Sequence, residues 1–530
     1  MGRMTSFALA LLAVSLAIPA DLISQRQYLK KYDLDQTTGL SSSLPPSNSV
    51  SHVVSDGSML WIGTSKGLGR SLSAGSGWES FRYDPSFAND GIFAISLLGS
   101  SVWVATGFDK QVGDGTVQTG SGYAVSSDGG TSWTHAPQVL DQRADSILSY
   151  GINDSIWILP VVVPEQNVTF DIAQSPGAVW VASWASGLRR STDNGASWQR
   201  ILLPTDERSS LRPSDTLWSY APGDTLRLRK IFRRVDPRRN NNLLAFSVLA
   251  LGPDTIWCGT AGGVNKSTDG GASWLRFTHT NQASPILGNW VIAVDEQRIG
   301  AFHRIWTTNW RAEDQNEDFG VSYTDDDGRF WKNLLHGVRA YDFAFRDSVA
   351  YIATEDGLYR TTNGGDNFEK FSEITDPVTH QVIASSKVFS VEVVGDTVFV
   401  GTGDGMASTV DDGSSPFGSV WKIYRAYERS SANGGTYAYP NPFSPVQEPV
   451  RIHYGWTGQP ERTVTIDIFD FGMNRVRSLV RHAPRSGSTE FDEVWDGRND
   501  DGRIAANGVY IYRLQLDDAD PSYGKILLLQ

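Results

Sequence analysis

Cysteine is almost absent from this chain: Cys258 is the only one among 530 residues. An internal disulfide is therefore excluded, and the fold has to be stabilised by packing. Cys258 lies in a strand-like run, 256–260, so we expect a small buried residue there and not a nucleophile. Basic residues are outnumbered by acidic ones, and the net charge of −13 argues against broad nucleic-acid binding.

Motifs of metal and nucleophile chemistry are also absent. The eight histidines show no His-x-x-x-His or similar ligand spacing. Neither a phosphate-binding P-loop nor a Gly-x-Ser-x-Gly phrase occurs. The sequence therefore predicts no metal site, no cofactor and no catalytic residue, and it gives enzymatic activity no support.

Only one long apolar run occurs, at the N-terminus. Arg3 precedes an apolar stretch, 7–18, which leads to Pro19 and Ala20. This order is typical of a secretory signal peptide, and the stretch is too short to span a bilayer comfortably. The alternative is an apolar first strand. We predict a signal peptide over 1–20, a mature chain from about Asp21 without a transmembrane segment, and an exported bacterial protein, secreted or held at the cell surface.

A short phrase recurs along the chain, Ser-x-Asp-x-Gly-x-x-Trp, which we call the box motif. Three intact copies begin at Ser126, Ser191 and Ser267, and looser, degenerate or broken copies begin at Thr324, Thr361, Ser71 and Thr409. The Asp can accept backbone amides of its own hairpin, the Gly can supply a positive φ, and the Trp can fold onto the neighbouring sheet. We therefore predict a structural role, although a row of carboxylates could also indicate acid–base or metal chemistry. The residues in this role are Asp128, Gly130, Trp133, Asp193, Gly195, Trp198, Asp269, Gly271, Trp274, Asp326, Gly328 and Trp331.

A second pattern, an apolar run that ends in small residues, accompanies the box motifs and defines seven units. The runs are 60–64, 102–106, 179–183, 256–260, 305–308, 350–354 and 398–402. Within one unit we predict four strands, for example 243–250, 255–260, 263–267 and 274–278, separated by glycine-rich turns. Four-stranded units protect their edges when they are arranged around an axis. We therefore predict that residues 21–427 form an all-β, seven-bladed β-propeller.

Two units contain insertions, which fall on loops at one face in propellers. The segment 139–166 looks like an extra hairpin, and 203–242 is polar and rich in arginine. The arginine cluster of 203–242 is a candidate anion-binding site, represented by Arg227, Arg229, Arg233 and Arg234. A solvated hairpin is the plainer interpretation.

The composition changes after Tyr427. Residues 428–436 predict a short flexible linker. Alternating runs such as 463–469 and 508–514 supply strands for a second domain, 437–530, which we predict to be a small immunoglobulin-like β-sandwich. The turn 499–502 is rich in aspartate but lacks the alternating spacing of an EF-hand, so a plain turn is predicted there and not a Ca²⁺ site.

On its three intact box motifs, the segment 50–427 resembles the Asp-box (BNR-repeat) propellers of sialidases, xyloglucanases, sortilin-type receptors and photosystem assembly factors. Its first unit, 60–68, also resembles propeller repeats in sensor regions of bacterial two-component regulators. Sialidases of this superfamily bind the substrate carboxylate with an arginine triad, the first member usually within an Arg-Ile-Pro phrase. That phrase is absent here, and the arginines gather in one insertion, so no catalytic residue is carried over.

Residues 437–530 resemble the C-terminal sorting domain of type IX secretion cargo and the related FlgD-like immunoglobulin-type domain. The resemblance rests on Tyr439-Pro-Asn-Pro-Phe443, the run 466–472, Trp495-Asp-Gly497, the run 507–512 and the ending 524–530. The Asp-rich turn at 499–502 is nearer to the FlgD-like version. The resemblance implies contact of 437–530 with outer-membrane secretion machinery.

Three functions follow from these observations as hypotheses. The first is an exported propeller that binds an extracellular protein or glycan through loops at one face, with the C-terminal domain as a delivery or anchoring module. The second is a secreted glycoside hydrolase, sialidase-like or xyloglucanase-like, which needs two carboxylates facing each other. The third is an assembly factor of the cell envelope.

Overall fold

In the computed structural model the chain folds entirely into β-sheets and short turns over the residues that the structure describes. These are 45–73, 75–81, 84–87, 90–113, 115–216, 236–377, 381–425, 436–446, 449–456, 461–486 and 490–529. Within these ranges the helical elements are three 3-10 turns, η2 (Pro85–Phe87), η3 (Pro237–Arg239) and η4 (Asn241–Leu243). None of the helices in this part of the chain is long and apolar enough to cross a membrane.

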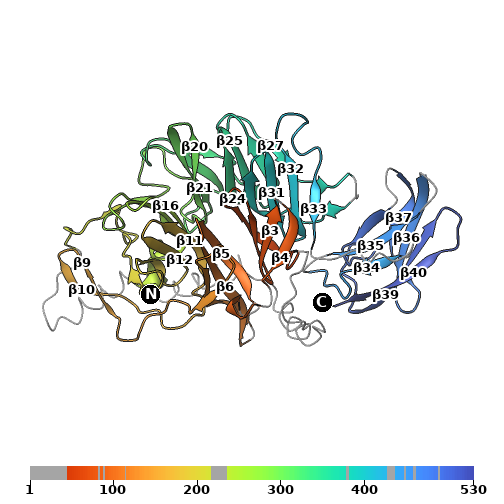
Figure 1. Cartoon of the computed structure of the whole chain (residues 1–530), viewed down its shortest axis with the longest axis horizontal. Helices are drawn as coiled ribbons and strands as arrows, with labels where there is room; N and C mark the ends of the chain where they lie inside the picture. Colours follow the sequence, from red (N-terminus) through yellow and green to blue (C-terminus); the bar gives the residue numbers. More distant parts are fainter. Residues whose placement is uncertain are drawn as a thin grey trace.

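Seven antiparallel sheets follow one another along the described part of the chain, and each contains four strands consecutive in the sequence, with a fifth in the fourth sheet. We call them blades 1 to 7 (Figure 1). Blade 1 contains β1 (Val50–Ser55), β2 (Leu60–Thr64), β3 (Gly67–Ser73) and β4 (Ser76–Ser80). Blade 2 contains β5 (Gly91–Leu98), β6 (Ser101–Val112), β7 (Gly115–Ser126) and β8 (Thr134–Ala136). Blade 3 contains β11 (Thr169–Ser175), β12 (Ala178–Ser183), β13 (Gly187–Ser191) and β14 (Gln199–Arg200).

The other four blades repeat this order. They are built from β16 (Ala245–Leu251), β17 (Thr255–Thr260), β18 (Gly263–Ser267) and β19 (Trp274–Phe277), with β15 (Ser210–Leu211) added beside β19; β20 (Val294–Ile299), β21 (Phe302–Asn309), β22 (Gly320–Thr324) and β23 (Lys332–Leu334); β24 (Ala340–Arg346), β25 (Val349–Thr354), β26 (Gly357–Thr361) and β27 (Glu369–Phe371); and β30 (Val388–Val394), β31 (Thr397–Thr402), β32 (Gly405–Val410) and β33 (Lys422–Tyr424).

The first strand of each blade contacts the first strands of the two neighbouring blades, so these strands surround an axis and the ring is closed. Blade 1 meets blade 7 in a shared core that contains Val53, Trp78 and Phe399. The backbone amide of Gly405 also donates to the carbonyl of Asn48 across this junction. The predicted all-β propeller is confirmed, and each of the seven apolar runs lies on the second strand of a blade.

Residues after the propeller form two further sheets. One contains β34 (Tyr437–Tyr439), β35 (Val450–Gly455) and β38 (Glu490–Trp495), and the other contains β37 (Arg475–Ser486), β36 (Glu461–Phe469), β39 (Gly508–Leu516) and β40 (Ser522–Leu528). Both sheets contribute to one core, with Ile452 and Trp495 from the first and Ile466 and Tyr512 from the second. The segment is therefore a β-sandwich, which lies beside the blade of β30–β33 (Figure 1).

The sandwich and the propeller are joined by a buried charge cluster. Asp404 lies in the turn between β31 and β32 and accepts hydrogen bonds from Arg425 and from Arg451 of β35. The side chains of all three are at most 4% exposed. Burial by itself would raise the pKa of Asp404, but the two guanidinium groups outweigh it and hold the pKa below its ordinary value.

The insertion at 139–166 contains the hairpin of β9 (Ile147–Tyr150) and β10 (Asn153–Trp157), at the place where the sequence predicted one. Its Ile156 packs into the core between blades 3 and 4, and the Tyr150 hydroxyl donates to the carbonyl of Ala272 in blade 4. A smaller pair, β28 (Ile374–Thr375) and β29 (Val382–Ile383), leads into blade 7. The predicted signal peptide, the candidate cluster of Arg227, Arg229, Arg233 and Arg234, and most of the 428–436 linker lie outside the described residues.

Candidate functional site

The box motifs close the hairpins between the third and fourth strands. In blade 3 the Asp193 carboxylate accepts the backbone amide and hydroxyl of Ser197 and the hydroxyl of Ser191, while the Ser191 hydroxyl accepts the amide of Gly195. The hydrogen bonds from Ser197 and Ser191 lower the pKa of Asp193 to about 2. The same contacts recur around Asp128, Asp269 and Asp326. Each box carboxylate is therefore engaged by its own turn.

Each box also packs on the preceding blade. A Cβ on Gly195, whose φ is +85°, would lie 2.6 Å from the Trp103 ring of blade 2. Trp198 then meets Trp103 edge-on, with ring centroids 6.1 Å apart. In the degenerate first copy, a Cβ on Gly75 would lie 2.6 Å from the Tyr424 hydroxyl of blade 7. Box glycines and aromatics thus form the seams between blades.

A set of basic side chains that the sequence analysis missed strengthens these seams. They stand immediately before the first residue of a box on the third strand and reach the box of the next blade. Arg70 donates to the carbonyl of Gly129, Arg190 to that of Gly270, and Lys266 to the Asp327 carboxylate. Arg360 likewise pairs with Asp411 of the broken last copy. Their fixed position relative to the box was a usable sequence signal.

The two ends of the propeller axis differ. In a four-stranded meander, the hairpin between the first and second strands and the hairpin between the third and fourth strands lie at one end of the axis. The hairpin between the second and third strands and the link to the next blade lie at the other end. The boxes therefore lie at the end opposite to the one where the innermost strands begin. Binding residues at the second end have to come from the start of each first strand, from the connection between the second and third strands, and from the long inter-blade connections.

A β-bulge occurs near the start of the first strand in six blades, at the same place in each. Bulges re-aim the side chain of the extra residue. The bulged residue is aromatic in five of these blades, and it is Ser51 in blade 1. The five aromatic residues are Phe93, Phe170, Phe246, Tyr341 and Phe389.

These rings form a continuous arc with two tryptophans, Trp290 in the segment that precedes blade 5 and Trp310 in the connection between β21 and β22 of that blade. From Phe93 in blade 2 to Phe389 in blade 7, successive ring centroids are 5.4 to 6.4 Å apart. Only Phe246 is fully buried, and the others are half-buried, so each keeps part of its ring in water. We call these seven residues the aromatic collar. It follows the ring of innermost strands around the axis.

Four carboxylates lie near the collar on the innermost strands. Asp171 and Asp342 directly follow Phe170 and Tyr341, while Asp295 and Glu392 lie opposite the second-strand aromatics Trp306 and Phe399. We call them the axial carboxylates. Three of them accept an amide of the next blade, namely Asp171 from Val248, Asp342 from Val391 and Glu392 from Ser55. They therefore cap exposed edges of the innermost strands.

The axial carboxylates are weak acids. Each touches water but is surrounded by protein, and this desolvation raises the pKa of Asp171 to about 6 and that of Asp295, Asp342 and Glu392 to about 7. Mutual repulsion adds to the effect, for example between Asp295 and Asp342. Within the described part of the chain none of the four makes an ion pair. Near neutral pH they carry charge that no described cation balances.

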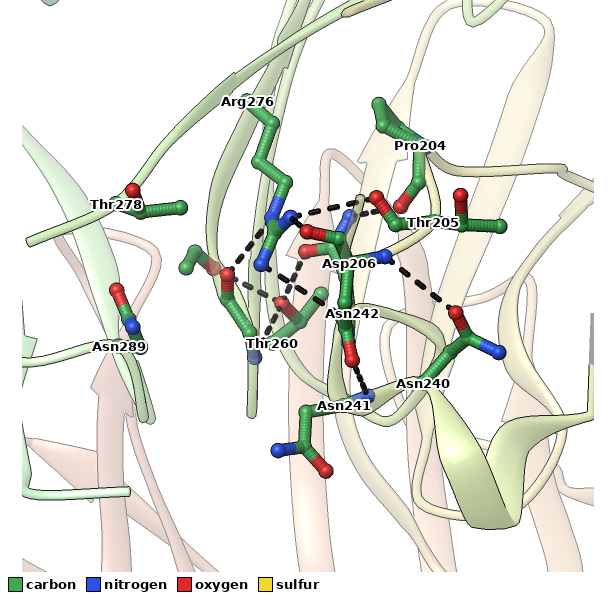
Figure 2. Close-up of polar contacts among 12 residues, drawn as sticks. Pro204, Thr205, Asp206, Asn240, Asn241, Asn242, Thr260, Arg276, Thr278 and Asn289 are labelled. Atoms are coloured by element: carbon green, nitrogen blue, oxygen red, sulfur yellow. Dashed lines mark hydrogen bonds and ion pairs between the residues drawn. The ribbon is translucent and has the colours of Figure 1, made fainter. Parts of the chain in front are cut away.

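A polar network holds the base of the arginine-rich insertion beside the collar. Figure 2 shows Arg276, Asp206 and Asn242 converging where the chain leaves and re-enters blade 4. Arg276 donates to the carbonyl of Asp206, and the Asp206 carboxylate accepts the amide of Asn242 at 2.9 Å. Asn242 in turn accepts the hydroxyl of Thr260. This closure fixes the path into β16, and so the position of Phe246.

The structure also shows the surroundings of Cys258 and of the possible metal ligands that the sequence analysis considered. Cys258 is buried, and burial raises the pKa of its thiol, so it is a packed core residue. Among the described residues no three His, Cys, Asp or Glu side chains are grouped closely enough to hold a metal ion. The collar was missed, although a signal was present: Phe93, Phe170, Tyr341 and Phe389 each stand ten residues before the aromatic of the second strand.

No family model matches the sequence, and no curated protein does. Solved structures are similar in fold. An ancestral GH74 enzyme is 16% identical with a TM-score of 0.50, and the match covers 92% of this chain and 63% of that enzyme. PorZ, a bacterial surface component of the type-IX secretion system of Porphyromonas gingivalis, is 14% identical over 91% of this chain and 66% of its own, with a TM-score of 0.34.

A further similar structure is YCF48 bound to D1 peptide, 12% identical over 73% of this chain and 97% of its own, with a TM-score of 0.39. At these identities the likeness concerns the fold alone. The sheet order and the ring closure define the class of this chain as a β-propeller.

Proposed function

We propose that this chain is an exported, surface-held or secreted propeller of the Asp-box type that binds an extracellular protein or glycan with its aromatic collar. The collar is the observation that carries the proposal. It gathers seven aromatic side chains from six blades around the axis, and all but one remain half-exposed. Partly exposed aromatic clusters are typical of binding surfaces, because each ring offers a large rigid contact area.

The box motifs, by contrast, are structural in this proposal. Their carboxylates are occupied by the amides and hydroxyls of their own turns, and their glycines and aromatics pack against the preceding blade. They also lie at the end of the axis opposite to the collar. Ligand binding and blade assembly thus use different residues.

Collar variants test the binding role. We expect Tyr341→Ser and Phe389→Ser to weaken capture of the native ligand at least tenfold in a pull-down from cell-surface extracts and on a glycan array. Phe330→Ala is the matched control, because Phe330 is 58% exposed and lies beside a box, at the other end of the axis. Equal capture by the collar variants and the control would contradict the proposal.

Delivery is assigned to the C-terminal sandwich, which we propose to be a type IX sorting or FlgD-like immunoglobulin-type domain. Deletion of 437–530 is then expected to leave a folded propeller in the periplasm of a host with a type IX machine. Arg451→Met keeps the sandwich and removes its ion pair with the propeller. If the Arg451→Met variant reached the surface and the deletion variant did not, the sandwich itself would be the signal for export. If the deletion variant also reached the surface, the sandwich would have an adhesion or assembly role and no role in delivery.

A glycoside hydrolase is the second candidate, and one observation favours it. Asp295 and Asp342 have pKa values raised to about 7, as a general acid requires, and Asp342 directly follows the half-exposed collar residue Tyr341. Against it, the Asp342 carboxylate already accepts the amide of Val391. Hydrolysis of xyloglucan or of a fluorogenic sialoside by the mature chain, with turnover lost in Asp342→Asn but binding retained, would select the enzyme. Co-purification with envelope machinery and no glycan binding would select the assembly factor.

A further inference from the structure

Among the described residues the axial carboxylates lack a counter-charge, and this bears on what the collar binds. Asp171, Asp295, Asp342 and Glu392 come from blades 3, 5, 6 and 7, and no described cation pairs with any of them. The described charged groups nearby already have partners: Glu296 pairs with Arg298, Arg346 with Asp396 and Asp411, and Arg339, 5.7 Å from the Trp310 ring, with Glu355. Burial lowers the pKa of His52 to about 4 and raises that of the Cys258 thiol. Negative charge therefore accumulates at the axis as the pH rises.

Two buried hydroxyls near these carboxylates also lack partners. Ser247 of blade 4 and Ser390 of blade 7 occupy the strand position that Asp171 and Asp342 occupy in their own blades. Each is 2% exposed, and its hydroxyl finds no hydrogen-bond partner among the described residues. Buried hydroxyls are usually satisfied, so these two leave hydrogen-bonding capacity unused on the same strands.

We propose that the aromatic collar receives a cationic side chain, arginine or lysine, of a partner polypeptide, whose charged group reaches the axial carboxylates. This inference rests on the proposed binding function and names its ligand. The faces of aromatic rings attract cations, and Arg stacks on them through its planar guanidinium. Asp171 and Asp342 follow their collar residues by one strand residue, about 3.3 Å, which is within the reach of a side chain held between the rings, and Glu392 follows Phe389 by three residues on the same strand.

The geometry favours an organic cation over a metal ion or a neutral sugar. A bare metal ion needs several ligands at one point, and no described group of three side chains provides them. A neutral sugar could stack on the collar but would leave the carboxylates without a counter-charge. An extended cationic side chain with several N–H donors supplies both the charge and the hydrogen bonds.

The test uses the mature full-length chain and two probe peptides, Ac-Gly-Gly-Arg-Gly-Gly-NH₂ and the same peptide with neutral citrulline in place of arginine. Calorimetric titration is expected to show at least tenfold tighter binding of the arginine peptide. Its affinity is expected to rise at least threefold from pH 5.5 to pH 8 and to fall with salt, because the axial carboxylates ionise in that range. Asp171→Asn with Asp342→Asn, which keeps one acceptor oxygen in each side chain, is expected to remove the preference for arginine, and Phe330→Ala to leave it unchanged.

The pH and salt series on the unaltered protein keeps the inference falsifiable even where a variant fails to fold. Equal affinity for the two peptides, or binding that is insensitive to pH and salt, would overturn it. A neutral cello-oligosaccharide that binds at the collar while neither peptide does would overturn the cationic ligand but leave the proposed binding function intact. If the collar variants bound every probe and the native ligand as tightly as the unaltered protein does, both the cationic ligand and the proposed binding function would be contradicted.

Discussion

Arg451 of the sandwich and Asp404 of blade 7 form a buried ion pair that joins the two domains, with Nη2 2.6 Å from Oδ1. Arg425, the last described residue of the propeller, shares the same carboxylate. A buried carboxylate between two guanidinium groups holds a fixed geometry, because separation would leave charges without partners. The sandwich is therefore positioned against the propeller by a specific contact as well as by its linker.

The first prediction concerns this contact. Asp404→Asn leaves both arginines without their counter-charge, and we expect it to destabilise the junction by roughly 3 kcal/mol. Chemical denaturation with hydrogen exchange at β35 measures the effect. Asp356 occupies the same turn position in blade 6 but makes an exposed pair with Lys370, so Asp356→Asn should cost below about 1 kcal/mol. Similar losses in the two variants would show that the junction does not depend on the buried pair.

The second prediction concerns box glycines. Gly195 and Gly177 have nearly the same φ, +85° and +82°, but an added Cβ meets Trp103 at Gly195 and open space at Gly177. Gly177→Ala should cost about 1 kcal/mol from the left-handed backbone alone. Gly195→Ala should cost roughly 3 kcal/mol, because the ring has to move as well. Thermal unfolding measures the loss of stability in each variant. Equal losses in Gly177→Ala and Gly195→Ala would mean that the seam between blades 2 and 3 is loosely packed.

The third prediction concerns a box carboxylate. Asp269→Ala removes the acceptor of the Ser273 amide and should lower stability by roughly 1 kcal/mol, a small value because the site is wet. Asp269→Asn should be milder, since the amide oxygen still accepts. The pKa of Asp269 is lowered, so its contribution is present above about pH 4 and is lost on further acidification. Loss of ligand binding with unchanged stability in Asp269→Ala would refute the structural role.

The fourth prediction concerns pH and the axial carboxylates. Their folded pKa values are raised, so the folded protein binds more protons than the unfolded chain between about pH 4 and pH 7. Stability should therefore fall as the pH rises through this window, by up to about 4 kcal/mol for each of Asp295 and Asp342, whose pKa rises from 3.8 to about 7. Melting temperatures at pH 5 and pH 8 measure it, and Asp295→Asn with Asp342→Asn should flatten the decline. A double variant with the slope of the unaltered protein would place the effect elsewhere.

The blade pattern was accessible to sequence analysis because it depends on local periodicity. The predicted strands 243–250, 255–260, 263–267 and 274–278 match β16 to β19 within one or two residues at each end. The turn residues between them are glycines and aspartates whose backbone requirements are local. The box motif similarly predicted its own hydrogen bonds, because donors and acceptor lie within four residues of each other.

What the sequence by itself determined is thus the repeat, its strands and turns, and the change of composition that separates the propeller from the sandwich. Only the tertiary structure decided that Phe93, Phe246 and Phe389 belong to one collar, that the axial carboxylates share one axis without a counter-charge, and that Arg451 meets Asp404. These relationships join residues tens to hundreds of positions apart. They arise only when closure of the ring brings the first strands together, and no local pattern encodes that closure.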